Sequence, residues 1–243
     1  MKRIGYLAGA LLCVSAVQVQ AQELEEILEA HHEVIGLDQF KQHDSFVMRG
    51  TAMQMGMEFP VTIYQKRTES GTKMRMELEF QGQTMVPQAF NGEEGWKLMP
   101  GMSGGMEIQD ATAEELAELK DMKLEGPFYG AEKAGHTLTL LGEDEFEGSP
   151  VYMIELKKES GFSATFYMDK ETYIVLGQTT QSNMNGQEMS ITQVMSNYQE
   201  VEGMVFPTST ETRAMGQTVL TMTISDVSVD EDIDDAIFER PEK

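Results

Sequence analysis

The chain has 243 residues, with 41 acidic against 18 basic side chains, a net charge of −23 at pH 7 and one cysteine. Nucleic acid and anionic membrane surfaces repel a protein of this charge, so the composition argues against nucleic-acid binding. The length fits a single domain, because all-β barrels and sandwiches commonly reach about 200 to 250 residues.

The first 21 residues have the pattern of a secretory signal peptide. Two basic residues precede an apolar run over residues 4–19, and Val19-Gln20-Ala21 offers small residues at the two positions that a signal peptidase reads. Cleavage after Ala21 leaves residues 22–243 as one domain of net charge −25, because two positive charges are lost. It also removes Cys13, the only cysteine, so we expect a bacterial periplasmic protein without disulfides.

The segment after the predicted cleavage site has a helical pattern. Acidic residues are frequent, Gly36 follows as a stop, and the other positions recur at intervals of three and four, at Leu24, Ile27, Leu28, His31 and Ile35. This pattern predicts an amphipathic helix whose apolar face covers another apolar surface.

Alternation of apolar and polar residues predicts about a dozen strands. Five are expected before residue 101, near 46–55, 57–67, 73–80, 84–90 and 96–100. Seven more are expected after residue 135, near 136–141, 151–158, 163–169, 174–182, 188–198, 205–213 and 217–227. Short glycine-containing gaps favour an antiparallel meander. The predicted fold is mainly β, a strongly curved sheet or open barrel that is too wide to be filled by its own side chains.

Residues 101–135 interrupt the strands. A loose loop is expected around Gly101, Gly104 and Gly105. Thr112 with Glu115 three residues later predicts a capping box and a helix. A short helix or turn is expected near 127–133. We expect this insertion and the N-terminal helix to form a lid over the curved sheet, with inward-facing residues Leu24, Ile27, Leu28, Leu116 and Leu119.

The apolar face of the early strands is predicted to line a lipid-binding cavity. The chain has 20 methionines, and their flexible, polarizable side chains suit a surface that moulds to acyl chains. For a single methionine, ordinary core packing remains the alternative. The predicted wall residues are Met57, Phe59, Val61, Ile63, Met74, Met76, Leu78, Phe80, Trp96 and Leu98.

Several motifs carry a family resemblance. Residues 89–100 read AFNGEEGWKLMP, and further motifs stand at 167–176, 197–207 and 237–241. In order and spacing they resemble LolA-type outer-membrane lipoprotein-sorting proteins, in the Bacteroidetes branch of the superfamily that also holds LolB and the RseB-like sensors. The resemblance implies a half-open antiparallel barrel of about eleven strands with helices over its concave face. It also implies a carrier that binds lipoprotein acyl chains or another amphiphilic lipid there.

The resemblance implies a lid latch and partners as well. In the carrier, an arginine in a Lys-Arg-Pro strand end holds the lid. Lys66-Arg67 stands at that place, with Thr68 instead of the proline. The implied partners are inner- and outer-membrane lipoprotein transfer proteins, with the protein itself a monomer. An envelope stress sensor or protein-interaction module of the same fold stays open as an alternative.

No enzyme motif is found, and we predict a protein without enzymatic activity, cofactor or metal. The sequence has no His-Glu-x-x-His spacing, no Gly-x-Ser-x-Gly elbow and no phosphate loop. Two metal alternatives stay open. Met53-Gln54-Met55-Gly56-Met57, if its thioethers share a strand face, is compatible with Cu(I). The acidic segment 230–235 could hold Ca²⁺, although it lacks the glycine of a hand-type loop, and a solvated face is the favoured interpretation.

Overall fold

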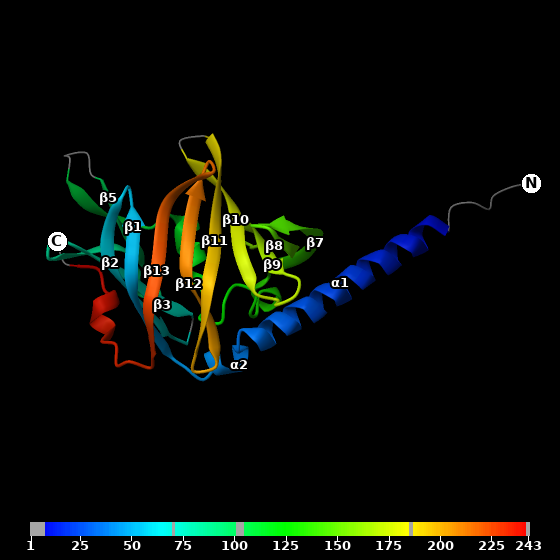
Figure 1. The fold of residues 1–243 in the computed structure, drawn as a ribbon, viewed down its shortest axis with the longest axis horizontal. Helices are drawn as coiled ribbons and strands as arrows, with labels where there is room; N and C mark the ends of the chain where they lie inside the picture. Colours follow the sequence, from blue (N-terminus) through cyan, green and yellow to red (C-terminus); the bar gives the residue numbers. More distant parts are fainter. Residues whose placement is uncertain (1–7, 70, 101–104, 185–186, 242–243) are drawn as a thin grey trace, which may run out of the picture.

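The computed structural model describes residues 8–69, 71–100, 105–184 and 187–241. They form one thirteen-stranded antiparallel sheet with few helices (Figure 1). The helices are α1 (Ala8–Val34), α2 (Leu37–Phe40) and α3 (Ala113–Lys120), with the 3₁₀ turns η1 (Glu132–Ala134) and η2 (Asp235–Phe238). The strands are β1 (Ser45–Gln54), β2 (Met57–Arg67), β3 (Thr72–Phe80), β4 (Gln83–Phe90), β5 (Gly95–Pro100), β6 (Met106–Asp110), β7 (Thr137–Phe146), β8 (Ser149–Lys157), β9 (Ser163–Asp169), β10 (Val175–Met184), β11 (Gln187–Val201), β12 (Met204–Ala214) and β13 (Gln217–Val229).

The strand order is β6-β5-β4-β3-β2-β1-β13-β12-β11-β10-β9-β8-β7. Two meanders are therefore joined where β1 pairs with β13. Among the described residues no pairing between β6 and β7 closes the sheet, so the predicted half-open barrel is confirmed, with thirteen strands rather than eleven. Strand β6 was not predicted. It pairs with β5, where Leu98 lies opposite Ile108.

This strand order dictates where the insertion lies. β6 and β7 are the two edges of the sheet, so residues 111–136 must cross from one edge to the other. They cross over the concave face, where Leu119 packs on Met74 and Phe90. The predicted capping box is confirmed: the Glu115 amide donates to Thr112 Oγ1, and Glu115 accepts from the Thr112 amide. Gly101 and Gly104 of the predicted loop lie outside the described residues.

The N-terminal helix lies on the other half of the same face. Leu24 and Ile27 are buried against Leu156 and Phe166 of β8 and β9, and Leu28 packs beside them. The helix begins at Ala8, so it runs through most of the predicted signal peptide, of which residues 1–7 lie outside the described part. Its N-terminal end projects away from the sheet (Figure 1). No described helix is long and apolar enough to cross a membrane.

The convex face of β1 to β3 is covered by the C-terminal segment. Ile233 and Phe238 pack on Val47, and the carboxylate of Asp235 lies 3.0 Å from Lys66 Nζ and 3.3 Å from Lys73 Nζ. Carboxylates of the acidic segment are therefore engaged in ion pairs. Across the described residues, no three His, Cys, Asp or Glu side chains gather as a metal ion would require.

Candidate functional site

A cavity of about 740 Å³ lies between the concave face and the crossing segment 111–136. Its floor comes from strands of both meanders and includes Met48, Gln65, Phe166, Met195, Tyr198 and Phe206. Its cover includes Leu119, Leu124 and Phe128, and the end of α1 adds His31 and Ile35. Ligand pockets commonly have volumes of about 300 to 1,000 Å³ and mostly apolar walls, so this cavity is large enough for a small amphiphile.

A few polar groups stand in this apolar wall. The Tyr198 hydroxyl donates to the carbonyl oxygen of Val175, and burial raises the pKa of Tyr198. Gln178 Nε2 donates to Gln193 Oε1 at 2.5 Å. The Tyr198 hydroxyl and the Gln178 amide group therefore each have a partner within the wall and do not depend on a ligand for one.

Ion pairs and a contact between a histidine and a carboxylate tie the margins of the crossing segment to both halves of the sheet. Glu115 pairs with Lys97 of β5 on one side. On the other side, Glu118 lies 2.7 Å from Lys158 Nζ, next to β8, and Asp121 lies 3.3 Å from His136 Nε2. These contacts hold the two margins of the cover to the two halves of the sheet.

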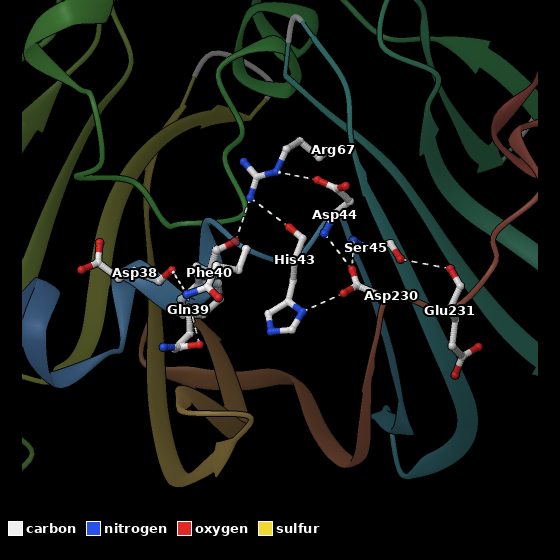
Figure 2. A network of polar contacts seen from close by, with 10 residues as sticks. Asp38, Gln39, Phe40, His43, Asp44, Ser45, Arg67, Asp230 and Glu231 are labelled. Atoms are coloured by element: carbon white, nitrogen blue, oxygen red, sulfur yellow. Dashed lines mark hydrogen bonds and ion pairs between the residues drawn. The ribbon is translucent and has the colours of Figure 1, made fainter.

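Arg67 ends β2 and joins three separate segments. Its Nη2 donates to the carbonyl oxygens of Phe40 at 2.8 Å and His43 at 3.1 Å, and its Nε lies 3.5 Å from Asp44 Oδ1 (Figure 2). Its Nη1 lies 2.7 Å from Oε1 of Glu125, in the crossing segment. The linker between α2 and β1 is held in turn by Asp230, which accepts from His43 Nδ1 and from the Asp44 amide, both at 2.8 Å.

Glu125 is the buried carboxylate of the cover. Only 3% of its side chain is exposed, and it lines the cavity. Its second oxygen, Oε2, is buried without a hydrogen-bond partner. A buried carboxylate is costly unless it is paired, so the bond to Arg67 fixes residue 125, and with it the crossing segment, on the sheet.

His31 lies where the end of α1 meets the cover. Its side chain is 7% exposed, its Nδ1 donates to the carbonyl oxygen of Tyr173 at 2.8 Å, and its ring meets that of Phe128 edge-on with centroids 5.4 Å apart. Burial lowers the pKa of His31 from 6.5 to about 4. The imidazole is therefore neutral at pH 7. His32 is only partly buried, and its pKa is also lowered by burial.

None of the ten predicted wall residues is among those that line this cavity. Eight lie on the same concave face in β2 and β3. Met74 and Met76 pack under the insertion near Leu119. The other six continue this face along the strands, away from the cavity and toward the β1–β2 and β3–β4 turns: Met57, Phe59, Val61, Ile63, Leu78 and Phe80. There the rings of Phe59 and Phe80 have centroids 5.8 Å apart.

The prediction that Trp96 and Leu98 lie on the concave wall is wrong, because the structure places both on the convex face. Trp96 aligns with Ala89 and, through it, with Arg75, which donates to the carbonyl oxygen of Ile237 in the C-terminal segment. Lys97 faces inward instead, toward Glu115 of α3. Both faces of β5 are covered, so an apolar side chain here does not identify the concave face.

The copper alternative required three thioethers on one face, and this expectation is wrong. Gln54 lies opposite Met57, and Met53 lies opposite Glu58. Because side chains alternate along each strand, Met53 and Met57 point to opposite faces, and Met55 stands in the turn between them. The tight turn reverses the face, which a simple count of every second residue overlooks.

Six exposed methionines gather at hairpin tips at one end of the half-barrel, where the strands turn. We call this set the methionine rim: Met53, Met55, Met57, Met99, Met106 and Met215. The hairpins β1–β2, β5–β6 and β12–β13 all turn at this end, because the strands alternate in direction. Figure 1 places the tips of β1 and β12 at the same end of the molecule. Turns at the opposite end of the half-barrel carry polar residues such as Glu93, Glu94 and Glu202.

Two rim residues adopt a backbone conformation that methionine rarely tolerates. Met55 has φ 51° and is 92% exposed, and Met215 has φ 51° and is 79% exposed; each precedes a glycine of positive φ. Two-residue turns with both φ values positive favour Asn-Gly, and a left-handed residue other than glycine costs about 1 to 2 kcal/mol. These methionines therefore do not serve the folding of the turns.

We expect Met55→Asn and Met215→Asn each to raise the free energy of unfolding by about 1 kcal/mol, because asparagine tolerates the left-handed conformation. Urea denaturation measures this as a higher midpoint with an unchanged slope. Gln81→Asn, at φ 52° in the β3–β4 turn, should raise the free energy of unfolding by a similar amount. Gln54→Asn, beside the β1–β2 turn, should leave it unchanged. Equal midpoints for M55N and Q54N would contradict the assignment of strain.

The cavity and the sheet define the class of fold, which is a half-open β-barrel with an apolar cavity under the crossing segment 111–136. No protein-family model matches the chain, and no curated protein matches it by sequence. Solved structures share the fold. A domain from Vibrio parahaemolyticus named for outer membrane lipoprotein sorting is 12% identical with a TM-score of 0.57, over 84% of this chain and 95% of that one.

Two further solved structures share this fold. A DUF1329 family protein from Desulfovibrio piger is 13% identical with a TM-score of 0.57, over 88% of this chain and 97% of that one. A LolA superfamily protein from Nitrosomonas europaea is 17% identical with a TM-score of 0.54, over 89% of this chain and 97% of that one. The chain therefore has the LolA-like fold that its motifs predicted.

Proposed function

We propose that the protein is an exported, non-enzymatic carrier that shields the acyl chains of lipoproteins, or another amphiphilic lipid, in the cavity under segment 111–136. One observation carries the proposal: a covered space of about 740 Å³, walled mainly by apolar side chains of both meanders. Burial of each methylene there contributes about 0.8 kcal/mol, which drives a chain from water into the cavity.

The similar solved structures support this proposal through their names, one of which refers to outer membrane lipoprotein sorting. We further propose residues 1–21 as a cleaved signal peptide, residues 22–243 as a single periplasmic domain that is a monomer, and membrane-bound lipoprotein transfer proteins as partners. In this proposal, the concave residues Val61, Ile63, Met76 and Leu78 contact a chain that is longer than the cavity.

We propose Arg67 as the latch of the cover, with Glu125 as its acceptor. Its four contacts to the cover and to the α2–β1 linker support this role. Cargo enters when the ion pairs at the edges of the cover open together, and apolar contact with the cargo then offsets their loss. Leu24, Ile27, Leu28, Leu116 and Leu119 form the apolar underside of the lid in this scheme.

We expect Met195→Trp to weaken binding of a fluorescent fatty acid by roughly 50-fold, because the indole displaces about three methylenes at about 0.8 kcal/mol each. Met195 lines the cavity floor. Ser196→Trp is the matched control, since Ser196 is the next residue and is exposed on the convex side. Fluorescence titration of the two variants measures the difference.

Native mass spectrometry of the protein purified from envelope extracts identifies the cargo directly. A co-purified lipid or acylated peptide that is lost in M195W supports the carrier. A uniformly empty protein that also fails to bind the fatty acid would count against it and would favour the protein-interaction module.

A further inference from the structure

The methionine rim is not accounted for by the cavity. Its two most exposed members, Met55 and Met215, occupy left-handed turn positions that asparagine would fill at lower cost. They make this end apolar without stabilising it. The same type of turn is built with polar residues at Gln81, Glu147 and Glu202, so the turn itself does not require methionine. A group of exposed large apolar side chains at one end of the fold indicates a surface that is covered in use.

The arrangement of the rim favours a lipid surface over a protein groove. The methionines stand on three separate hairpin ends, and polar residues such as Gln54, Glu58 and Gln217 lie among them. Each tip can therefore bury one or two thioethers in the interfacial layer while its neighbours stay among the headgroups. A protein-binding patch is instead expected to be continuous.

The charges restrict the kind of lipid. The described residues of the three rim hairpin ends, 53–58, 99–100, 105–107 and 214–217, include Glu58 and Glu107 and no lysine or arginine. The whole chain carries a net charge of −23. Anionic headgroups repel such an end of the molecule, so the fitting surface has zwitterionic headgroups.

The rim also continues into the concave face. From Met57 at the tip, this face passes through Phe59, Val61 and Ile63 to Gln65 at the cavity. A protein resting on its rim would turn the open end of the half-barrel toward the lipid. The apolar path from bilayer to cavity is then unbroken by a charged side chain on β2.

We propose that the methionine rim docks the protein on zwitterionic lipid bilayers by shallow insertion of its hairpin tips. Docking by the rim does not depend on what the cavity carries. The docking proposal can therefore fail while the carrier function stands, and the carrier function can fail while the docking proposal stands. The test uses the exported protein after removal of residues 1–21, because the apolar run 4–19 would itself enter a bilayer. It carries an environment-sensitive fluorophore on Gln54→Cys, then its only cysteine, and is titrated with phosphatidylcholine vesicles. The expected result is a blue shift of the fluorophore emission at this tip. No shift is expected when the fluorophore is on Glu202→Cys, at the opposite end of the half-barrel.

The decisive variant is M55N/M215N, because it should fold more stably than the original chain. Loss of each methionine from the bilayer should cost about tenfold in partitioning, so the double variant should need about 100-fold more lipid for the same shift. Glu202→Asn is the matched control, because Glu202 has φ 50° in the same type of turn at the other end of the half-barrel. E202N should give the same lipid titration as the original protein.

Three results would overturn the proposal. The first is an identical lipid titration for M55N/M215N and E202N. The second is tighter binding when phosphatidylglycerol is added to the vesicles, since that would show an attraction the rim does not provide. The third is a rim variant that loses a co-purified protein while its lipid titration is unchanged, which would assign the surface to a protein partner.

Discussion

Replacing Arg67 with methionine should lower the free energy of unfolding by about 3 to 5 kcal/mol, the usual cost of leaving a buried charge without its partner. The cost arises at Glu125, whose side chain is 3% exposed and whose one partnered oxygen is held by Arg67. The two carbonyl oxygens of the α2–β1 linker lose their donor as well. Urea denaturation of the purified variant measures the change.

A double-mutant cycle separates the ion pair from general packing. R67M/E125L should recover most of the lost stability, because replacing both partners with apolar groups removes the unpaired charge. Hydrogen exchange adds a local measurement: in R67M, amides of residues 123–131 should exchange faster while those of β11 and β12 stay protected. If exchange over 123–131 is unchanged, Arg67 does not hold the cover.

The sequence was sufficient for most of the fold. Alternation located twelve strands, and the Thr112 and Glu115 pair located α3, because both signals are local. β6 was missed, because it has only five residues, Met106–Asp110, and follows a glycine-rich stretch that reads as a loop. Its strand character comes from pairing with β5, a contact that the local pattern does not contain.

The cavity wall was harder to predict for a physical reason. A period of two shows which residues share a face, but not which face is covered by what. Over part of β1 to β5 both faces are covered, the concave one by the insertion and the convex one by the C-terminal segment, so apolar residues point both ways. Glu125 gave only a weak signal, an acid between Leu124 and a Gly-Pro turn, and its partner lies 58 residues away.

A fall in pH from 7.5 to 5 should destabilise the protein by about 2 kcal/mol through His31 alone, since its pKa is 6.5 unfolded and about 4 in the folded chain. Between these two values the unfolded chain binds a proton at this position and the folded chain does not. Stability therefore rises with pH across this window and is lost as the pH falls. His32 acts in the same direction, because burial also lowers its pKa.

Urea denaturation at several pH values checks this, with His31→Gln as the test and His32→Gln as the matched neighbour. Glutamine can still donate to the Tyr173 carbonyl oxygen but does not titrate, so H31Q should flatten the slope between pH 7.5 and 5, and H32Q should flatten it less. Hydrogen bonds from His43 and from the Asp44 amide lower the pKa of Asp230, and the bond from Arg49 lowers the pKa of Glu231, so these carboxyl groups act at more acidic pH, outside this window. A slope in H31Q equal to that of the original chain would show that His31 is not the titrating group.

Since His31 joins α1 to Phe128 of the cover, its protonation should also loosen the cover before the sheet unfolds. Hydrogen exchange over residues 123–131 at pH 5 would detect this loosening.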